Sequence, residues 1–93
     1  MKELDPLLHS QLRLAVMSIL MNLEEADFVY IRQQTNSTAG NLSVQIDKLS
    51  KAGYISVERS LIDRKTRTTC RVTPQGRQAF EQYVSTIKEY LNI

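Results

Sequence analysis

The chain has 93 residues, of which 42% are hydrophobic and 24% are charged, and its net charge is +2. This length fits a single domain over residues 1–93, and the composition is ordinary for a soluble globular protein. No apolar run approaches the roughly 20 residues of a membrane span, and the N-terminus lacks the pattern of a secretion signal. The single cysteine, Cys70, allows no internal disulfide, so we expect a cytoplasmic protein that does not contact membranes.

The N-terminal part of the chain predicts two helices. Apolar residues from Leu12 to Leu23 recur at the spacing of one helical face, and Ser10 is a suitable N-cap for this first helix. The segment 24–26 predicts a loop. Asp27 then caps a short second helix.

A turn and a third helix are expected next. Asn36 stands where a turn between two helices needs a left-handed residue, a conformation that asparagine tolerates. Thr38, or alternatively Ser37, caps the third helix, and Gly53 ends it because glycine adopts a positive φ freely. The residues spaced to face the core are Leu42, Ile46 and Leu49.

The C-terminal part predicts a β-hairpin and a long helix. Tyr54–Ser60 and Thr68–Val72 are rich in β-branched and aromatic residues, which favours two antiparallel strands joined at the basic tip Asp63–Arg67. Thr73 followed by Pro74 is typical of a helix start. The resulting order predicts an α+β, mostly helical fold: a winged helix-turn-helix with a two-stranded β wing and a C-terminal dimerisation helix.

The charge is concentrated in the middle of the chain. Residues 30–80 contain nine basic and three acidic side chains, while both ends are acidic or neutral. Such a basic region indicates an electrostatic surface for nucleic acid. The alternative is a solvated surface of mixed charge.

The sequence offers little support for catalysis. His9 is the only histidine, and Cys70 lies in a predicted strand without a base nearby in the sequence, which favours a packed side chain over a reactive thiol. No Cys/His cluster has the spacing of metal ligands. The three glycines are too far apart for a phosphate-binding loop. We therefore expect no enzyme activity, no metal and no cofactor.

The outward face of the third helix is the strongest candidate for binding a partner. Gly40 is about 1 kcal/mol worse than alanine in a helix, a cost that is understandable if another backbone approaches closely. Base contacts are expected from Asn41, Val44 and Gln45, with adenine and the thymine methyl as favoured partners. The alternative is an ordinary solvent-exposed face. The DNA-binding candidates on this helix are Thr38, Ala39, Gly40, Asn41, Ser43, Val44, Gln45 and Lys48, of which Thr38, Ser43 and Lys48 suit phosphates.

The predicted wing tip is the second candidate surface. Its candidate DNA-binding residues are Arg64, Lys65 and Arg67. Arginine suits phosphates or a narrow minor groove, although such a tip could simply increase solubility. Asp63 is expected to brace a neighbouring arginine or to order the turn. Arg59 and Arg71 are either phosphate ligands or cross-strand partners of Glu58.

Both ends of the chain carry more apolar surface than a small core is expected to cover. We therefore expect a homodimer built from both termini, although the same stripe could close the core against the first helix. Two-fold symmetry would place the two third helices about one DNA turn apart. The predicted interface residues are Leu4, Leu7, Leu8, Phe80, Tyr83, Val84, Ile87, Tyr90 and Leu91.

Four blocks of the sequence resemble small winged-helix transcriptional regulators of the MarR-like superfamily. The blocks are Leu8–Val16, Gly40–Ser43, Leu49–Ile55 and Arg67–Gly76, and the resemblance covers nearly the whole chain. It implies a homodimeric, cytoplasmic regulator of transcription that binds double-stranded DNA. It also implies base contacts from Thr38 to Lys48 and wing contacts from Arg64 to Arg67.

The sequence departs from the family pattern at two positions. Asn36 stands where glycine is common, and Ser37 stands where an apolar residue is common. The resemblance supplies neither a target sequence nor a small-molecule effector. An alternative function is a winged-helix module that binds another protein and not DNA. RNA binding would need exposed aromatic residues for stacking, and the candidate surfaces offer only Tyr54.

Overall fold

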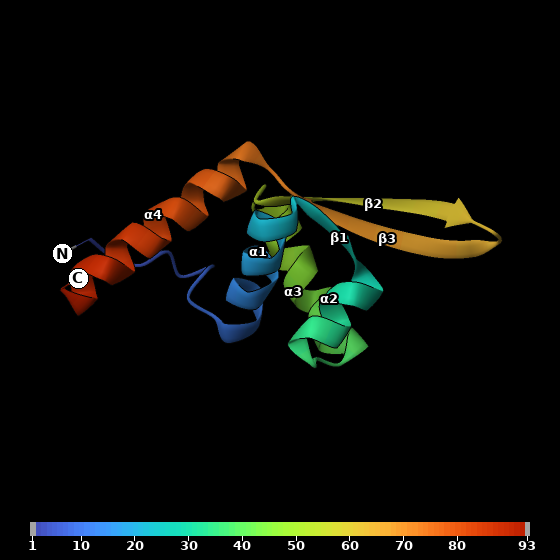
Figure 1. Ribbon diagram of the computed structural model, residues 1–93, viewed down its shortest axis with the longest axis horizontal. Helices are drawn as coiled ribbons and strands as arrows, with labels where there is room; N and C mark the ends of the chain where they lie inside the picture. The colour runs from blue at the N-terminus through green and yellow to red at the C-terminus, as the bar shows by residue number, and fades with distance from the viewer. Residues whose placement is uncertain (1, 93) are drawn as a thin grey trace.

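The computed structural model describes residues 2–92 and confirms the predicted fold class. Helices α1–α3 form a central body, α4 extends from one side of it, and the β2–β3 hairpin extends from the other (Figure 1). The described chain measures 50 × 25 × 21 Å along its principal axes. The elements in chain order are α1 (Gln11–Leu23), β1 (Glu25–Asp27), α2 (Phe28–Thr35), α3 (Ala39–Lys51), β2 (Ile55–Ile62), β3 (Lys65–Val72) and α4 (Pro74–Leu91).

Every helix begins at a side-chain cap that the sequence predicts. Each cap oxygen accepts a hydrogen bond from the backbone N–H three residues later, which satisfies one of the unpaired donors of the first turn. The left-handed residues are also confirmed, because Asn36 has a φ of 52° and Gly53 a φ of 82°. The four caps are Ser10, Asp27, Thr38 and Thr73.

The core lies where α1, α3, the sheet and the N-terminal segment meet. The three predicted α3 positions are buried in it, together with residues from every other helix and from β2 and β3. Its members are Leu8, Val16, Met17, Leu20, Ile31, Leu42, Ile46, Leu49, Ile55, Cys70, Val72 and Tyr83. In α1, the predicted apolar face extends too far, because Leu23 is 49% exposed.

Two residues predicted for a dimer interface belong to this core. Leu8 is 0% exposed and Tyr83 is 6% exposed within one chain, so neither presents a surface to a second copy. The Tyr83 hydroxyl also lies 2.9 Å from Nδ1 of His9, at hydrogen-bond distance. Both side chains are covered because the N-terminal segment folds back over α1 and α4.

The sheet contains a strand that the sequence does not predict. Its order is β1-β3-β2 and both pairings are antiparallel. The predicted loop at 24–26 is in part strand β1, in which Glu25 pairs with Arg71 and Ala26 with Cys70. Three residues carry too little local preference to indicate a strand, and β1 forms because a distant strand supplies its hydrogen bonds.

The hairpin is longer and its turn tighter than predicted. β2 runs to Ile62 and β3 begins at Lys65, which leaves only Asp63 and Arg64 in the turn. Both turn residues have positive φ, 50° and 63°, as a two-residue type I′ turn requires. Lys65 and Arg67 therefore lie on a strand and not in a loop.

A close packing point, here called the α4 junction, joins α4 to the end of α3 and the start of β2. It consists of Gly53, Tyr54, Thr73 and Gly76. The Thr73 hydroxyl donates to the Gly53 carbonyl at 2.6 Å, and the Thr73 N–H donates to the Tyr54 carbonyl at 3.1 Å. A Cβ added at Gly76 would lie 2.0 Å from that same carbonyl oxygen, so this position accepts only glycine.

Candidate nucleic-acid interface

The exposed face of α3 presents small and polar side chains. Gly40 stands in its first turn, and a Cβ added there would meet no atom of the described chain within 4 Å. The fold therefore does not require glycine at this position. The exposed candidates from Thr38 onward are Thr38, Ala39, Gly40, Asn41, Ser43, Val44 and Lys48.

The turn that leads into α3 is held by hydrogen bonds between polar side chains. Ser37 stands where the family pattern favours an apolar residue, and its hydroxyl lies 2.8 Å from that of Thr35. The Arg32 guanidinium donates through Nε to the Ser37 carbonyl at 3.2 Å. The Thr38 hydroxyl then accepts from the Asn41 N–H at 3.2 Å. The start of α3 is thus fixed in place, and its partial positive charge favours an anion in front of it.

The predicted base-reading set is not equally available. Val44 is 51% exposed and Asn41 is also exposed, but Gln45 is half-buried. The Gln45 Oε1 accepts a hydrogen bond from Nη1 of Arg13, and its Nε2 donates to Oδ1 of Asn41 at 3.0 Å. Both ends of the Gln45 amide are therefore occupied within the chain. The sequence gives no sign of this, because Arg13 lies 32 residues away on α1.

The wing cations differ in whether they are already paired. Arg64 and Lys65 are exposed and have no ion-pair partner among residues 2–92. Arg67 lies 3.8 Å from the Asp27 carboxylate through its Nε, so part of its charge is balanced. Arg71 pairs with Glu25 across the β1–β3 edge, which favours the cross-strand alternative for Arg71 with a different acid from the one expected.

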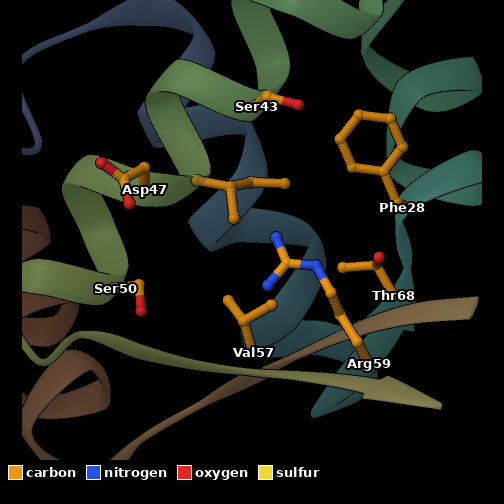
Figure 2. Close-up of a pocket in the computed structure, with 8 residues that line it drawn as sticks. Phe28, Ser43, Asp47, Ser50, Val57, Arg59 and Thr68 are labelled. Carbon is orange, nitrogen blue, oxygen red and sulfur yellow. The ribbon is translucent and has the colours of Figure 1, made fainter.

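Arg59 lies in a groove between α3 and the sheet. Figure 2 shows its guanidinium reaching from β2 toward the α3 side of the groove, between Phe28 and Val57. The groove has a volume of about 350 Å³. Arg59 has no ion-pair partner within the described chain, so the structure adds a cation between the helix and the wing. The lining residues are Phe28, Ser43, Ile46, Asp47, Ser50, Val57, Arg59 and Thr68.

Two titratable groups near this region are structural. Burial raises the pKa of the Cys70 thiol to about 11, against the opposing effect of the Arg59 charge, so little thiolate exists at neutral pH. Burial also raises the pKa of Tyr54 to about 12, and its hydroxyl donates to the Asp5 carboxylate. Within residues 2–92, no group of three or more His, Cys, Asp or Glu side chains could hold a metal ion, and no helix is long and apolar enough to cross a bilayer.

Comparison with known proteins identifies the family. The model of the winged helix DNA-binding domain matches residues 12–91 of this chain. The chain belongs to this winged-helix DNA-binding family. An uncharacterised protein of Methanocaldococcus jannaschii is 32% identical to it over 76 residues, which cover 82% of this chain and 83% of the relative.

Solved structures of transcriptional regulators agree in fold with this assignment. A transcriptional regulator homologue from Pyrococcus horikoshii matches with a TM-score of 0.87 and 27% identity, over 92% of this chain and 85% of that one. The transcriptional regulator BldR from Sulfolobus solfataricus matches in fold, with a TM-score of 0.74 and 23% identity, over 89% of this chain and 58% of that one. The resemblance to small winged-helix transcriptional regulators is confirmed, and the chain is a winged-helix DNA-binding protein.

Proposed function

We propose that this winged-helix protein regulates transcription as a cytoplasmic homodimer that binds specific sequences of double-stranded DNA. The observation that carries the proposal is the exposed face of α3, whose first turn is open at Gly40, together with wing cations that have no ion-pair partner among residues 2–92. A catalytic role has no support in the chemistry of the described side chains.

In this proposal α3 enters the major groove with its N-terminal half. The groove admits an α-helix, and small side chains at Ala39 and Gly40 let the backbone come close to the DNA. Asn41 and Val44 reach base edges, since both are exposed on this half. Backbone phosphates are bound by Thr38, Ser43 and Lys48.

The wing binds the DNA backbone or the minor groove beside α3. Arg64 and Lys65 lie at the tip and form no ion pair with any acid of residues 2–92, and Arg59 adds a third cation nearer to α3. These groups bind phosphates irrespective of sequence. Arg67 contributes less, because binding a phosphate would weaken its ion pair with Asp27.

The dimer forms through α4 and the N-terminal segment, which lie together on the side of the body opposite the wing (Figure 1). Leu91 is 61% exposed and Tyr90 is 47% exposed, which leaves apolar surface for a second copy to cover. A groove between α1 and α4 adds to this surface, and it is lined in part by Met21, Phe80 and Val84. The remaining predicted interface residues, Leu4, Leu7 and Ile87, are half-buried on this side.

Selection of bound sequences from a random duplex library tests the proposal. We expect an inverted repeat with half-sites about one helical turn apart, because a two-fold dimer presents two α3 helices. Affinity should fall steeply with salt as phosphate contacts release counterions. Absence of duplex binding even at low salt would overturn DNA binding and favour the protein-docking alternative. Selection of single, non-repeated sites would overturn the dimer.

A further inference from the structure

Three side chains form a hydrogen-bonded chain that ends on the exposed face of α3. The Arg13 guanidinium donates through Nη1 to Oε1 of Gln45, and Nε2 of Gln45 donates to Oδ1 of Asn41 at 3.0 Å. Arg13 is itself anchored, since its Nε donates to the Leu7 carbonyl at 2.6 Å. The chain therefore runs from the N-terminal segment through α1 to the surface that we assign to DNA.

The direction of this chain is fixed by its first member. A guanidinium has only donors, so the group facing it must be an acceptor, and Gln45 turns its oxygen toward Arg13. The Gln45 nitrogen then faces Asn41 and must meet an acceptor, so Asn41 turns its own oxygen toward Gln45. The Asn41 amide is left with its Nδ2 donors for an outside partner, and no atom within residues 2–92 accepts a hydrogen bond from them.

We propose that Arg13 and Gln45 are positioning residues that make Asn41 read DNA as a hydrogen-bond donor. This inference rests on the proposed function. An asparagine that is free to turn pairs with adenine through one donor and one acceptor, whereas a fixed donor suits a base that offers acceptors only. Guanine presents two acceptors in the major groove, N7 and O6. Thymine offers a single acceptor, O4, so Asn41 favours guanine over thymine and over the adenine that its residue type alone predicts.

The substitution Gln45→Glu reverses the hydrogen bond between positions 45 and 41 without changing Asn41, the residue that touches DNA. A carboxylate has only acceptors, so Glu at this position still accepts from Arg13 but also accepts from Asn41. Asn41 must then donate inward and present its oxygen outward. An outward oxygen favours a base with an amino group in the major groove, namely adenine or cytosine.

The experiment determines the base preference of each variant by selection from a random duplex library. Asn41→Ala first identifies the contacted base pair as the position at which preference is lost. At that position we expect the unsubstituted protein to favour guanine by about 5-fold or more, and Gln45→Glu to favour adenine or cytosine by a similar factor. Gln45→Met is the matched control, because it keeps the size but removes the amide, so Asn41 is free to turn and should favour adenine alone, the pairing of an unrestrained asparagine.

A second measurement needs no DNA. In the free protein, the side-chain amide protons of Gln45 should exchange with water more slowly than those of Asn41, because among residues 2–92 the Gln45 amide donates a hydrogen bond and the Asn41 amide does not. In Gln45→Glu the Asn41 amide protons should become protected. Because exchange is measured by NMR on the folded protein, this result stands apart from any loss of affinity caused by the added charge.

The outcomes separate this inference from the proposed function. Sequence-specific binding in which Gln45→Glu keeps the guanine preference, or in which the free Asn41 amide is already protected, overturns the inference and leaves the regulator intact. Failure of the unsubstituted protein to bind duplex DNA overturns both. If Gln45→Glu changes the preference from guanine to adenine or cytosine at the contacted position and at no other, the result supports both the inference and the proposed function.

Discussion

Helices α3 and α4 each carry a glycine in the first turn, and the two glycines have opposite surroundings. At Gly76 in α4, an added Cβ would lie 2.0 Å from a backbone oxygen of Tyr54. At Gly40 in α3, an added Cβ would meet open space within the described chain. The fold explains why position 76 needs glycine, but it does not explain the glycine at position 40.

This contrast separates the structural end of the molecule from the end that we assign to DNA. The start of α4 closes on the chain itself, while the start of α3 is open to a partner. A glycine that weakens a helix without helping the packing indicates that closeness to something outside the chain matters there. The predictions below test this division.

The largest effect is expected at the closed glycine. Gly76→Ala should reduce the free energy of unfolding by about 3 kcal/mol, because overpacking against a backbone atom cannot be relieved by a side-chain rotation. Urea unfolding followed by circular dichroism measures the change. An alanine variant as stable as the original protein would show that the α4 junction yields easily.

The apolar surface of α4 provides the next test. Leu91→Asp should weaken the proposed dimer by about 100-fold, or about 2.7 kcal/mol, because a carboxylate loses its hydration in an apolar interface. Sedimentation at several concentrations measures the dissociation constant. Leu61→Asp is the control, since Leu61 is 72% exposed at the far end of the wing. Equal dimerisation of both variants would remove α4 from the interface.

Each wing cation should add one phosphate contact to the dependence of DNA affinity on salt concentration. Removing Arg64 or Arg59 by alanine substitution should lower the slope of log affinity against log salt by about 0.9, the value expected for one phosphate contact. The loss should be the same on specific and random duplexes. Arg71→Ala is the matched control, because Arg71 is paired with Glu25. An unchanged slope for Arg64→Ala and Arg59→Ala would show that the wing does not contact the backbone.

The smallest stability effect is expected at the open glycine. Gly40→Ala should raise the free energy of unfolding by up to about 1 kcal/mol, since alanine is the better helix former and meets no obstacle. The same substitution should weaken DNA binding, because the added methyl keeps the helix backbone from the duplex. Fluorescence anisotropy with a labelled duplex measures the affinity. A variant that is more stable and binds DNA equally well would contradict a close approach at Gly40.

Local signals in the sequence predict much of the fold. The caps Ser10, Asp27, Thr38 and Thr73 are confirmed because a cap depends only on the few residues that follow it. The left-handed Asn36 is confirmed for a similar reason. The type I′ turn of the hairpin was missed, because Asp63–Arg64 lacks the glycine that usually marks such a turn.

Long-range contacts explain what the sequence does not show. Strand β1 depends on a partner strand more than 40 residues later, and Leu8 is buried only because the N-terminal segment folds back. The face of α3 was correctly predicted to be exposed. The sequence does not predict the hydrogen bond between Arg13 and Gln45, because Arg13 comes from another helix. The roles of individual residues in DNA binding and dimerisation stay predictions.

The α4 junction also has a mechanical consequence. Thr73 ties the start of α4 to Gly53 at the end of α3 and to Tyr54 at the start of the wing, and Gly76 leaves no space for sliding between them. A rotation of α4 must therefore move the end of α3 and the start of the wing with it. In a two-fold dimer, any change in how the two α4 helices cross would alter the separation of the paired DNA-facing surfaces, and with it the spacing of sites that one dimer can span.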